Sequence, residues 1–229
     1  METIEEYLET QVPLVRRNAD IVSKRELGQD FMLHIARKPK RYYYPRISKR
    51  QMDAEDMSVP RITVSDSLLG CITGYSAIGT NFFSVRDSGL IITKIDFDTA
   101  LKPNNKLVPD VDKSNEHWLV TYSKDTAKYK VVPIGKIFIH KATYTRTSGE
   151  DFIESIAELY IELDTDDVIR VSSDGKLTAS RGYWKLVMDF INDEAIELTA
   201  ISPKEFEAKK KVSAALLSIS DPMPNISRW

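Results

Sequence analysis

The chain of 229 residues is long enough for one large domain, and its content of 42% hydrophobic and 29% charged residues is ordinary for a globular protein. This composition excludes a chain that is disordered throughout, because a core of this size buries most of the surface that the unfolded chain exposes. The formal net charge of -2 excludes a strong overall field that would attract polyanions.

We expect the chain to reside in a reducing compartment without crossing a membrane. Cys71 is the only cysteine, so no internal disulfide can form, and a lone thiol among apolar neighbours fits a reduced interior. The sequence METIEEYLET at the start is acidic and lacks the apolar stretch of a secretory signal. No apolar run approaches the ~20 residues of a membrane span. A cytoplasmic location is therefore the expectation.

Residues 1–30 are expected to form an N-terminal helical segment. Thr3 and Glu6 have the spacing of a capping box, which predicts a short helix immediately after Thr3. The charged segment 14–26 is interpreted as a second helix. Gly28 is suited to end that helix, because glycine readily adopts the left-handed conformation found after a helix C-terminus.

A strand followed by a helix is predicted from Val59 onward. Residues 59–65 have the pattern of a strand that is entered through a proline, and Ser65 or Asp66 can cap the helix that follows. That helix carries apolar residues at helical spacing: Leu68, Leu69, Ile72 and Tyr75. Gly70 and Gly74 lie four positions apart within it, which permits the close approach of another backbone.

The remaining apolar segments predict many strands and one final helix. The strand segments are 31–36, 90–97, 116–122, 131–132, 136–144, 157–163, 168–172, 182–188 and 194–201. Ser202, Pro203 and Glu205 together form a strong helix start. The apolar stripe of that helix is expected at Val212, Ala215, Leu216 and Ile219.

This order of elements predicts an α+β fold with a mixed or antiparallel sheet, a few peripheral helices and a C-terminal helix. After the N-terminal segment, residues 31–148 form an α+β core, and residues 149–229 form a strand-rich extension that ends in the helix. No flexible linker separates these parts. We therefore expect one continuous domain.

The sequence contains no recognisable metal or phosphate-binding motif. The three histidines lie far apart in the chain and there is one cysteine, so no zinc-type spacing exists. Asp164, Asp166 and Asp167 resemble half of a calcium loop, but the required glycine and closing glutamate are missing. We interpret these aspartates as a polar turn and expect no metal site. The glycine spacings of phosphate-binding and dinucleotide-binding loops are also absent.

The segment 37–50 is the most unusual part of the composition. It contains seven basic residues, no acid and three consecutive tyrosines. Cations can neutralise phosphates, and tyrosines can stack on bases or on a nicotinamide ring, so this segment is a candidate for binding an anion such as nucleic acid. Tyr44 and Arg46 are its candidate ligand-binding residues. The alternative is a surface loop whose tyrosines pack on the core.

Three of the predicted strands carry polar residues in an informative order. His34 lies on the first strand. Arg61-Ile-Thr-Val-Ser65 forms a second strand, which ends in a hydroxyl residue and leads into a helix, and Glu116-His117-Trp118 begins a later strand. This order resembles that of ADP-ribosyltransferase-like folds. The resemblance covers residues 31–145.

The resemblance implies an NAD-binding or nucleotide-binding protein with three catalytic residues. His34 would hold the ribose of the cofactor, and Ser65 would support the nicotinamide pocket. Glu116 would stabilise the oxocarbenium-like transition state, because a carboxylate offsets the positive charge that develops on the sugar. Arg46 or Arg61 would contact the phosphates. NAD is the cofactor that this interpretation implies.

A different class of function is equally compatible with the sequence. The chain could be a non-enzymatic interaction protein of a phage or mobile element that binds a host protein or a component of its own particle. The candidate partner surfaces are the tail that ends in Trp229 and the acidic block 151–167. Nucleic-acid binding through residues 37–50 is a third option that is compatible with both classes.

Overall fold

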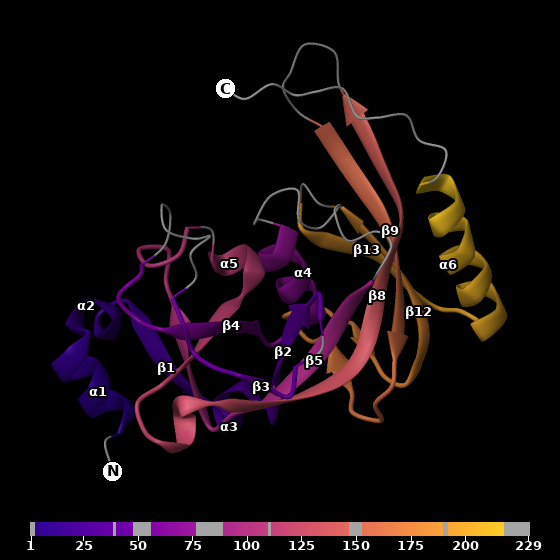
Figure 1. The fold of residues 1–229 in the computed structure, drawn as a ribbon. Helices are drawn as coiled ribbons and strands as arrows, with labels where there is room; N and C mark the ends of the chain where they lie inside the picture. The colour runs from indigo at the N-terminus through magenta and orange to yellow at the C-terminus, as the bar shows by residue number, and fades with distance from the viewer. Residues whose placement is uncertain are drawn as a thin grey trace.

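The computed structural model describes residues 3–38, 40–47, 56–76, 89–109, 111–146, 153–189 and 192–217. Within these ranges the protein has an α+β fold that is built on one large antiparallel sheet (Figure 1). Helices α1 and α2 lie at one end of the sheet, and α6 lies at the other end. The predicted fold class is therefore confirmed, and the sheet is antiparallel throughout its described pairings.

The first helix begins as the sequence predicts. Helix α1 (Ile4–Gln11) starts at a capping box, in which Thr3 and Glu6 each accept a hydrogen bond from the other residue's backbone N–H. These two bonds satisfy amides that otherwise lack a partner at a helix start. The buried side chains of Ile4 and Leu8 fix this helix against the core.

The segment 14–26 is not the single helix that its composition suggests. It is divided among α2 (Pro13–Arg16), β1 (Ala19–Ser23) and α3 (Lys24–Leu27). Strand β1 forms because its backbone pairs along its whole length with β6 (Thr99–Pro103), and such long-range pairing overrides local helix propensity. Gly28 ends α3 with a φ of 61°, so its predicted role as a helix terminator is confirmed.

The large sheet contains eleven strands within the described residues. Besides β1 and β6, its strands are β2 (Phe31–Ala36), β3 (Tyr42–Tyr43), β4 (Arg61–Ser65), β5 (Leu90–Asp96), β7 (Glu116–Val120), β8 (Tyr129–Arg146), β9 (Ile153–Leu163), β12 (Gly182–Asp189) and β13 (Glu194–Ala200). The spatial order is β1-β6-β7-β4-β2-β5-β8-β9-β12-β13, and β3 pairs with the start of β8. Strands β10 (Ile169–Arg170) and β11 (Thr178–Ala179) form a separate small ribbon.

Alternation along the central strands sends apolar side chains to both faces of the sheet. On one face, Leu33 of β2 belongs to a large core that includes Ile72 of α4 (Leu68–Ser76). On the other face, Met32 packs in a second core with Val64 and Leu119. Both faces of this part of the sheet are therefore covered, and even the polar side chains of Ser65 and Glu116 at its strand ends are buried.

Helix α4 is capped by Ser67, whereas the sequence pointed to Ser65 or Asp66. The Ser67 hydroxyl accepts a hydrogen bond from the Gly70 amide at 3.2 Å, which is the capping contact expected from the residue before a helix. Two short helices follow later in the chain: α5 (Val111–Ser114), which lies against α4, and the 3-10 helix η2 (Asp125–Ala127). The turn after α5 leads directly into β7.

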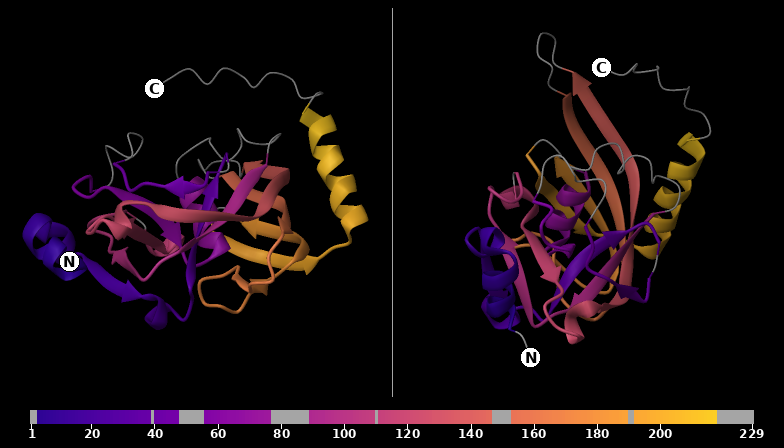
Figure 2. Two further views of the ribbon diagram at one scale, coloured as in Figure 1. Left: turned by 60° about the horizontal axis from the view of Figure 1, so that its bottom comes forward. Right: turned by 60° about the vertical axis from the view of Figure 1, so that its left-hand side comes forward.

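Strand β8 is the longest element, and it connects the two halves of the sheet. It pairs first with β3, then with β5, and along most of its length with β9. Strand β12 accompanies β9 only as far as the pair Asp189–Ile156. Beyond that pair, β8 and β9 continue as a two-stranded arm that projects from the body of the sheet (Figures 1 and 2).

Helix α6 (Pro203–Leu217) covers the face of β8, β9 and β12 opposite the main core (Figure 2). Its predicted cap is confirmed, since the Ser202 hydroxyl accepts a hydrogen bond from the Glu205 amide at 3.2 Å. The side chain that anchors it is the fully buried Phe206, which packs against the rings of Phe138, Tyr160 and Tyr183. The predicted stripe from Val212 to Ile219 lies outside the side chains that the structure describes.

Candidate functional site

The sheet register separates the three residues of the transferase-like interpretation. Ser65 pairs directly with Leu33 on one side and with Glu116 on the other. Directly paired residues of antiparallel strands have their side chains on the same face. His34 follows Leu33, so its side chain lies on the opposite face. The structure therefore brings Ser65 and Glu116 together but places His34 across the sheet from them.

Glu116 is held in a buried stack of polar and aromatic groups. Its side chain accepts a hydrogen bond from the indole N–H of Trp118 at 2.6 Å, and only 6% of the residue is exposed. The guanidinium of Arg61 lies 4.1 Å from the centre of the Trp118 ring, and its Nη1 donates to the backbone oxygen of Asp56 at 2.6 Å. These contacts engage Glu116 and Arg61 inside the protein rather than at its surface.

Ser65 joins the end of β4 to the turn before β7. Its hydroxyl lies 3.1 Å from the backbone oxygen of Ser114 and 3.2 Å from that of Asn115, so it can donate to either. It also accepts from the Ser67 amide at 3.4 Å. Because Ser65 is buried, this arrangement favours a structural role for the hydroxyl.

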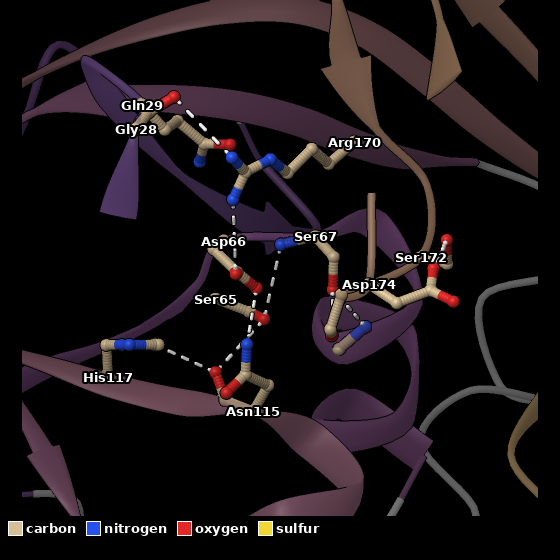
Figure 3. Close-up of polar contacts among 12 residues, drawn as sticks. Gly28, Gln29, Ser65, Asp66, Ser67, Asn115, His117, Arg170, Ser172 and Asp174 are labelled. Carbon is tan, nitrogen blue, oxygen red and sulfur yellow. Dashed lines mark hydrogen bonds and ion pairs between the residues drawn. The ribbon is translucent and has the colours of Figure 1, made fainter. Parts of the chain in front are cut away.

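A second group of polar residues surrounds the start of α4 (Figure 3). The buried carboxylate of Asp66 accepts a hydrogen bond from the Asn115 amide at 2.6 Å and lies 3.7 Å from the Arg170 guanidinium. The other terminal nitrogen of Arg170 reaches the backbone oxygen of Gly28 at 3.5 Å. The ring of His117 donates through Nδ1 to the backbone oxygen of Asn115 at 2.9 Å. Asp66, Asn115 and Arg170 together therefore join four distant parts of the chain, the fourth being the segment at Gly28.

Sequence reasoning treated Asp66 only as a possible cap and missed Asn115 and Arg170. Asn115 adopts a φ of 42°, and asparagine is one of the few residues other than glycine that adopt this left-handed conformation with any frequency. Arg170 offers no comparable signal, because it lies more than a hundred positions from Asp66 in the sequence. Its role emerges only from the folded arrangement.

Both histidines whose side chains the structure describes, the half-buried His34 and the buried His117, favour the neutral state. Burial lowers the pKa of His34, and the positive charges of Lys40 and Arg46 lower this pKa further. The contact of its Nδ1 with the Thr63 backbone oxygen at 2.9 Å acts in the opposite direction and raises the pKa. Burial also lowers the pKa of His117, against the effect of the negative Asp66. Each histidine therefore takes up a proton less readily in the folded protein than in the unfolded chain.

We expect the free energy of unfolding to fall as the pH drops from 7.5 to 5.5. In that range the unfolded chain protonates its histidines, whose ordinary pKa is about 6.5. The folded protein binds these protons less readily. The stability that the neutral histidines contribute is therefore fully present above pH about 6.5 and is lost as the pH falls below it. The loss should approach about 1 kcal/mol for each histidine. Urea denaturation at several pH values measures it.

The matched control for this prediction is the double variant His34→Asn/His117→Asn. Asparagine can retain the amide donor to Thr63 and to the Asn115 backbone but does not titrate in this range. Its stability should change less between pH 7.5 and 5.5 than that of the parent protein. An equally steep decline in the double variant would show that other groups cause the pH dependence.

The basic tyrosine segment divides its tyrosines between the core and the surface. Tyr43 pairs with Tyr129 and both are buried in the second core. Tyr42 pairs with Lys130, so it points outward, and Tyr44 is 60% exposed. Tyr43 of this segment therefore packs on the core as the second alternative expects, whereas Tyr42 is partly accessible and Tyr44 is exposed. Nucleic-acid binding by the segment stays a prediction.

Cations surround the outward tyrosine. The guanidinium of Arg41 lies 5.6 Å from the centre of the Tyr42 ring, and the ammonium of Lys128 lies 5.0 Å from it. We define the basic surface as Lys40, Arg41, Arg46, Lys128 and Lys130, all of which are exposed. Within the part of the chain that the structure describes, none of these five forms an ion pair with an acid.

Three aspartates of the acidic block, Asp164, Asp166 and Asp167, contact nearby cations. Arg181 donates to Asp164 at 2.6 Å and to Asp166 at 2.7 Å, and the Arg181 contacts lower the pKa of Asp166. Lys94 donates to Asp167 at 2.6 Å. This supports the interpretation of a polar turn. Among the described residues, no group of three or more histidine, cysteine or acidic side chains is arranged to hold a metal ion.

Comparison with known proteins identifies no relative. No family model matches the chain, and no curated protein or solved structure matches it either.

Every helix in the described part of the chain is too short or too polar to span a membrane. Trp229 and residues 151–152 of the acidic block lie outside the described residues, so the partner surfaces suggested there stay predictions.

Proposed function

We propose that this protein binds nucleic acid through the basic surface formed by β3, the residues beside it and the start of β8. The observation that carries the proposal is the set of five exposed cations without acidic partners among the described residues. A cation that already forms an ion pair gives up that contact when it binds a phosphate. Cations without such a contact are available to neutralise phosphates and release their counterions.

The position of the basic surface also supports the proposal. Residues from two distant segments form it, because Tyr42 and Tyr43 pair with Lys130 and Tyr129 in an antiparallel ladder. The buried rings of Tyr43 and Tyr129 anchor this ladder to the core. The cations are therefore presented by ordered backbone, which limits the conformational entropy that binding would cost.

The transferase-like interpretation receives less support from the geometry. Its three proposed catalytic residues lie on two faces of the sheet, and the Glu116 carboxylate already accepts a hydrogen bond from Trp118. NAD binding and catalysis stay predictions that rest on the resemblance. The interaction-protein hypothesis also stays a prediction, because its tail lies outside the described residues.

Binding of a fluorescein-labelled oligonucleotide of about 15 nucleotides, followed by anisotropy at increasing salt, tests the proposal. If the five cations contact five phosphates of a single strand, a plot of log affinity against log salt concentration should have a slope of about -3.5. The double variant Lys128→Glu/Lys130→Glu should weaken binding at least tenfold at low salt, because two attractive contacts become repulsive.

The control variant is Lys106→Glu/Lys204→Glu, which produces the same net charge at exposed positions on other elements. It should retain most of the affinity if binding depends on the basic surface rather than on overall charge. An equal loss in both double variants would contradict the proposed location. The absence of any binding to the parent protein at low salt would contradict the function.

A further inference from the structure

We infer that the basic surface takes single-stranded nucleic acid, with an unstacked base placed on the ring of Tyr44; this inference rests on the proposed function. Tyr44 is the most exposed aromatic side chain among the described residues, with 60% of its surface accessible. Basic residues lie close to Tyr44 in the sequence, at Arg41 and Arg46, and exposed aromatic rings combined with cations are the means by which many proteins bind single strands.

The neighbouring tyrosines do not offer the same stacking surface. The ring of Tyr42 is partly buried and is contacted by Arg41 and Lys128, while Tyr43 is buried against His34, whose ring lies 4.8 Å from it in an edge-on arrangement. Tyr44 is therefore the ring of this segment that a base can reach without displacing a protein group.

Charged and apolar side chains lie close to Tyr44 in the sequence. Arg41 precedes it and Arg46 follows it, and both side chains are exposed. Ile47, next to Arg46, is 46% exposed. A strand that runs along this segment would therefore meet a cation, an aromatic ring, a second cation and an apolar side chain in turn. Cations contact the backbone, and the ring accepts a base.

Duplex DNA can make the stacking contact only at an additional cost in free energy. Its bases are already stacked on one another, and exposing one requires the duplex to be locally unpaired. The cations could still contact duplex phosphates, since those contacts are independent of base stacking. The inference therefore predicts a preference for single strands over duplexes and over polyanions that have no bases.

The test compares four labelled probes of equal length at one salt concentration: single-stranded DNA, single-stranded RNA, duplex DNA and an abasic DNA strand. The single strands should bind about tenfold more tightly than the abasic strand, because stacking of one base contributes this much. Tyr44→Ala should remove that difference, and Tyr44→Phe should retain it, because phenylalanine preserves the stacking ring. Both substitutions are at an exposed position, so the fold should be unaffected.

The outcomes separate this inference from the proposed function. If all four probes bind equally and Tyr44→Ala has no effect, the basic surface binds polyanions but the inferred single-strand site is wrong. If none of the probes binds, the proposed function itself is wrong. A difference between the DNA and RNA single strands that Tyr44→Ala removes would support the stacking site and show which nucleic acid it takes.

Discussion

Replacing Gly70 by alanine is expected to lower the free energy of unfolding by about 3 kcal/mol, at the upper end of the usual cost of overpacking. A β-carbon at this position would overlap the Ser65 hydroxyl and the backbone oxygen of Ser114. Neither atom can move easily. The hydroxyl is held by its own hydrogen bonds, and the oxygen belongs to the turn that begins β7. The expected result is a protein that folds poorly or melts at a markedly lower temperature.

Gly74→Ala provides the control in the same helix. A β-carbon there would meet only the Ser114 β-carbon at 3.5 Å, which is an ordinary contact. Because alanine has the higher helix propensity, this variant should be as stable as the parent or up to about 1 kcal/mol more stable. Urea denaturation of the two variants measures the contrast. Equal stabilities would contradict the close approach of α4 to the β4 and β7 ends.

Phe206→Ala should destabilise the packing of α6 by about 3 kcal/mol, the lower end of the range for a buried phenylalanine. The ring is fully buried and contacts three other aromatic rings. Its removal leaves a cavity on the outer face of the sheet, while the main core on the opposite face remains complete. We therefore expect α6 to detach before the sheet unfolds.

Amide hydrogen exchange can distinguish detachment of α6 from global unfolding. In Phe206→Ala the amides of the first turns of α6 should exchange faster, while those of β2 and β5 keep most of their protection. Phe206→Leu should show a smaller effect, because leucine fills part of the cavity. Unchanged exchange in α6 would mean that other contacts hold the helix.

Local signals in the sequence predicted the elements that depend on local interactions. The capping box at Thr3 and the cap at Ser202 satisfy backbone groups within one turn, so their spacing was sufficient to locate both helices. The segment 14–26 was misread because β1 depends on a partner strand more than seventy positions away. Its shorter helix α3 has its own capping box at Ser23 and Glu26, a signal that was available but was overlooked.

The candidate site was less predictable than the fold. The basic segment was visible in composition, but whether each tyrosine faces the core or the solvent depends on its pairing with β8. Lys128 and Lys130 were not recognised, because they join the surface only through that pairing. His34, Ser65 and Glu116 all lie on the strands expected for them, yet the strand register, which sequence alone does not specify, decides which of them share a face.

The long strand β8 has a consequence for how this protein avoids aggregation. Its backbone pairs with β5 on one side and with β9 on the other, and without β8 these two strands would each have an unpaired edge. A chain cut between β8 and β9 would leave each fragment with a long row of unpaired backbone amides and carbonyls. Such edges readily pair with other copies, so the separate halves should form insoluble β-rich assemblies unless they recombine. We therefore expect each half to aggregate when it is produced without the other.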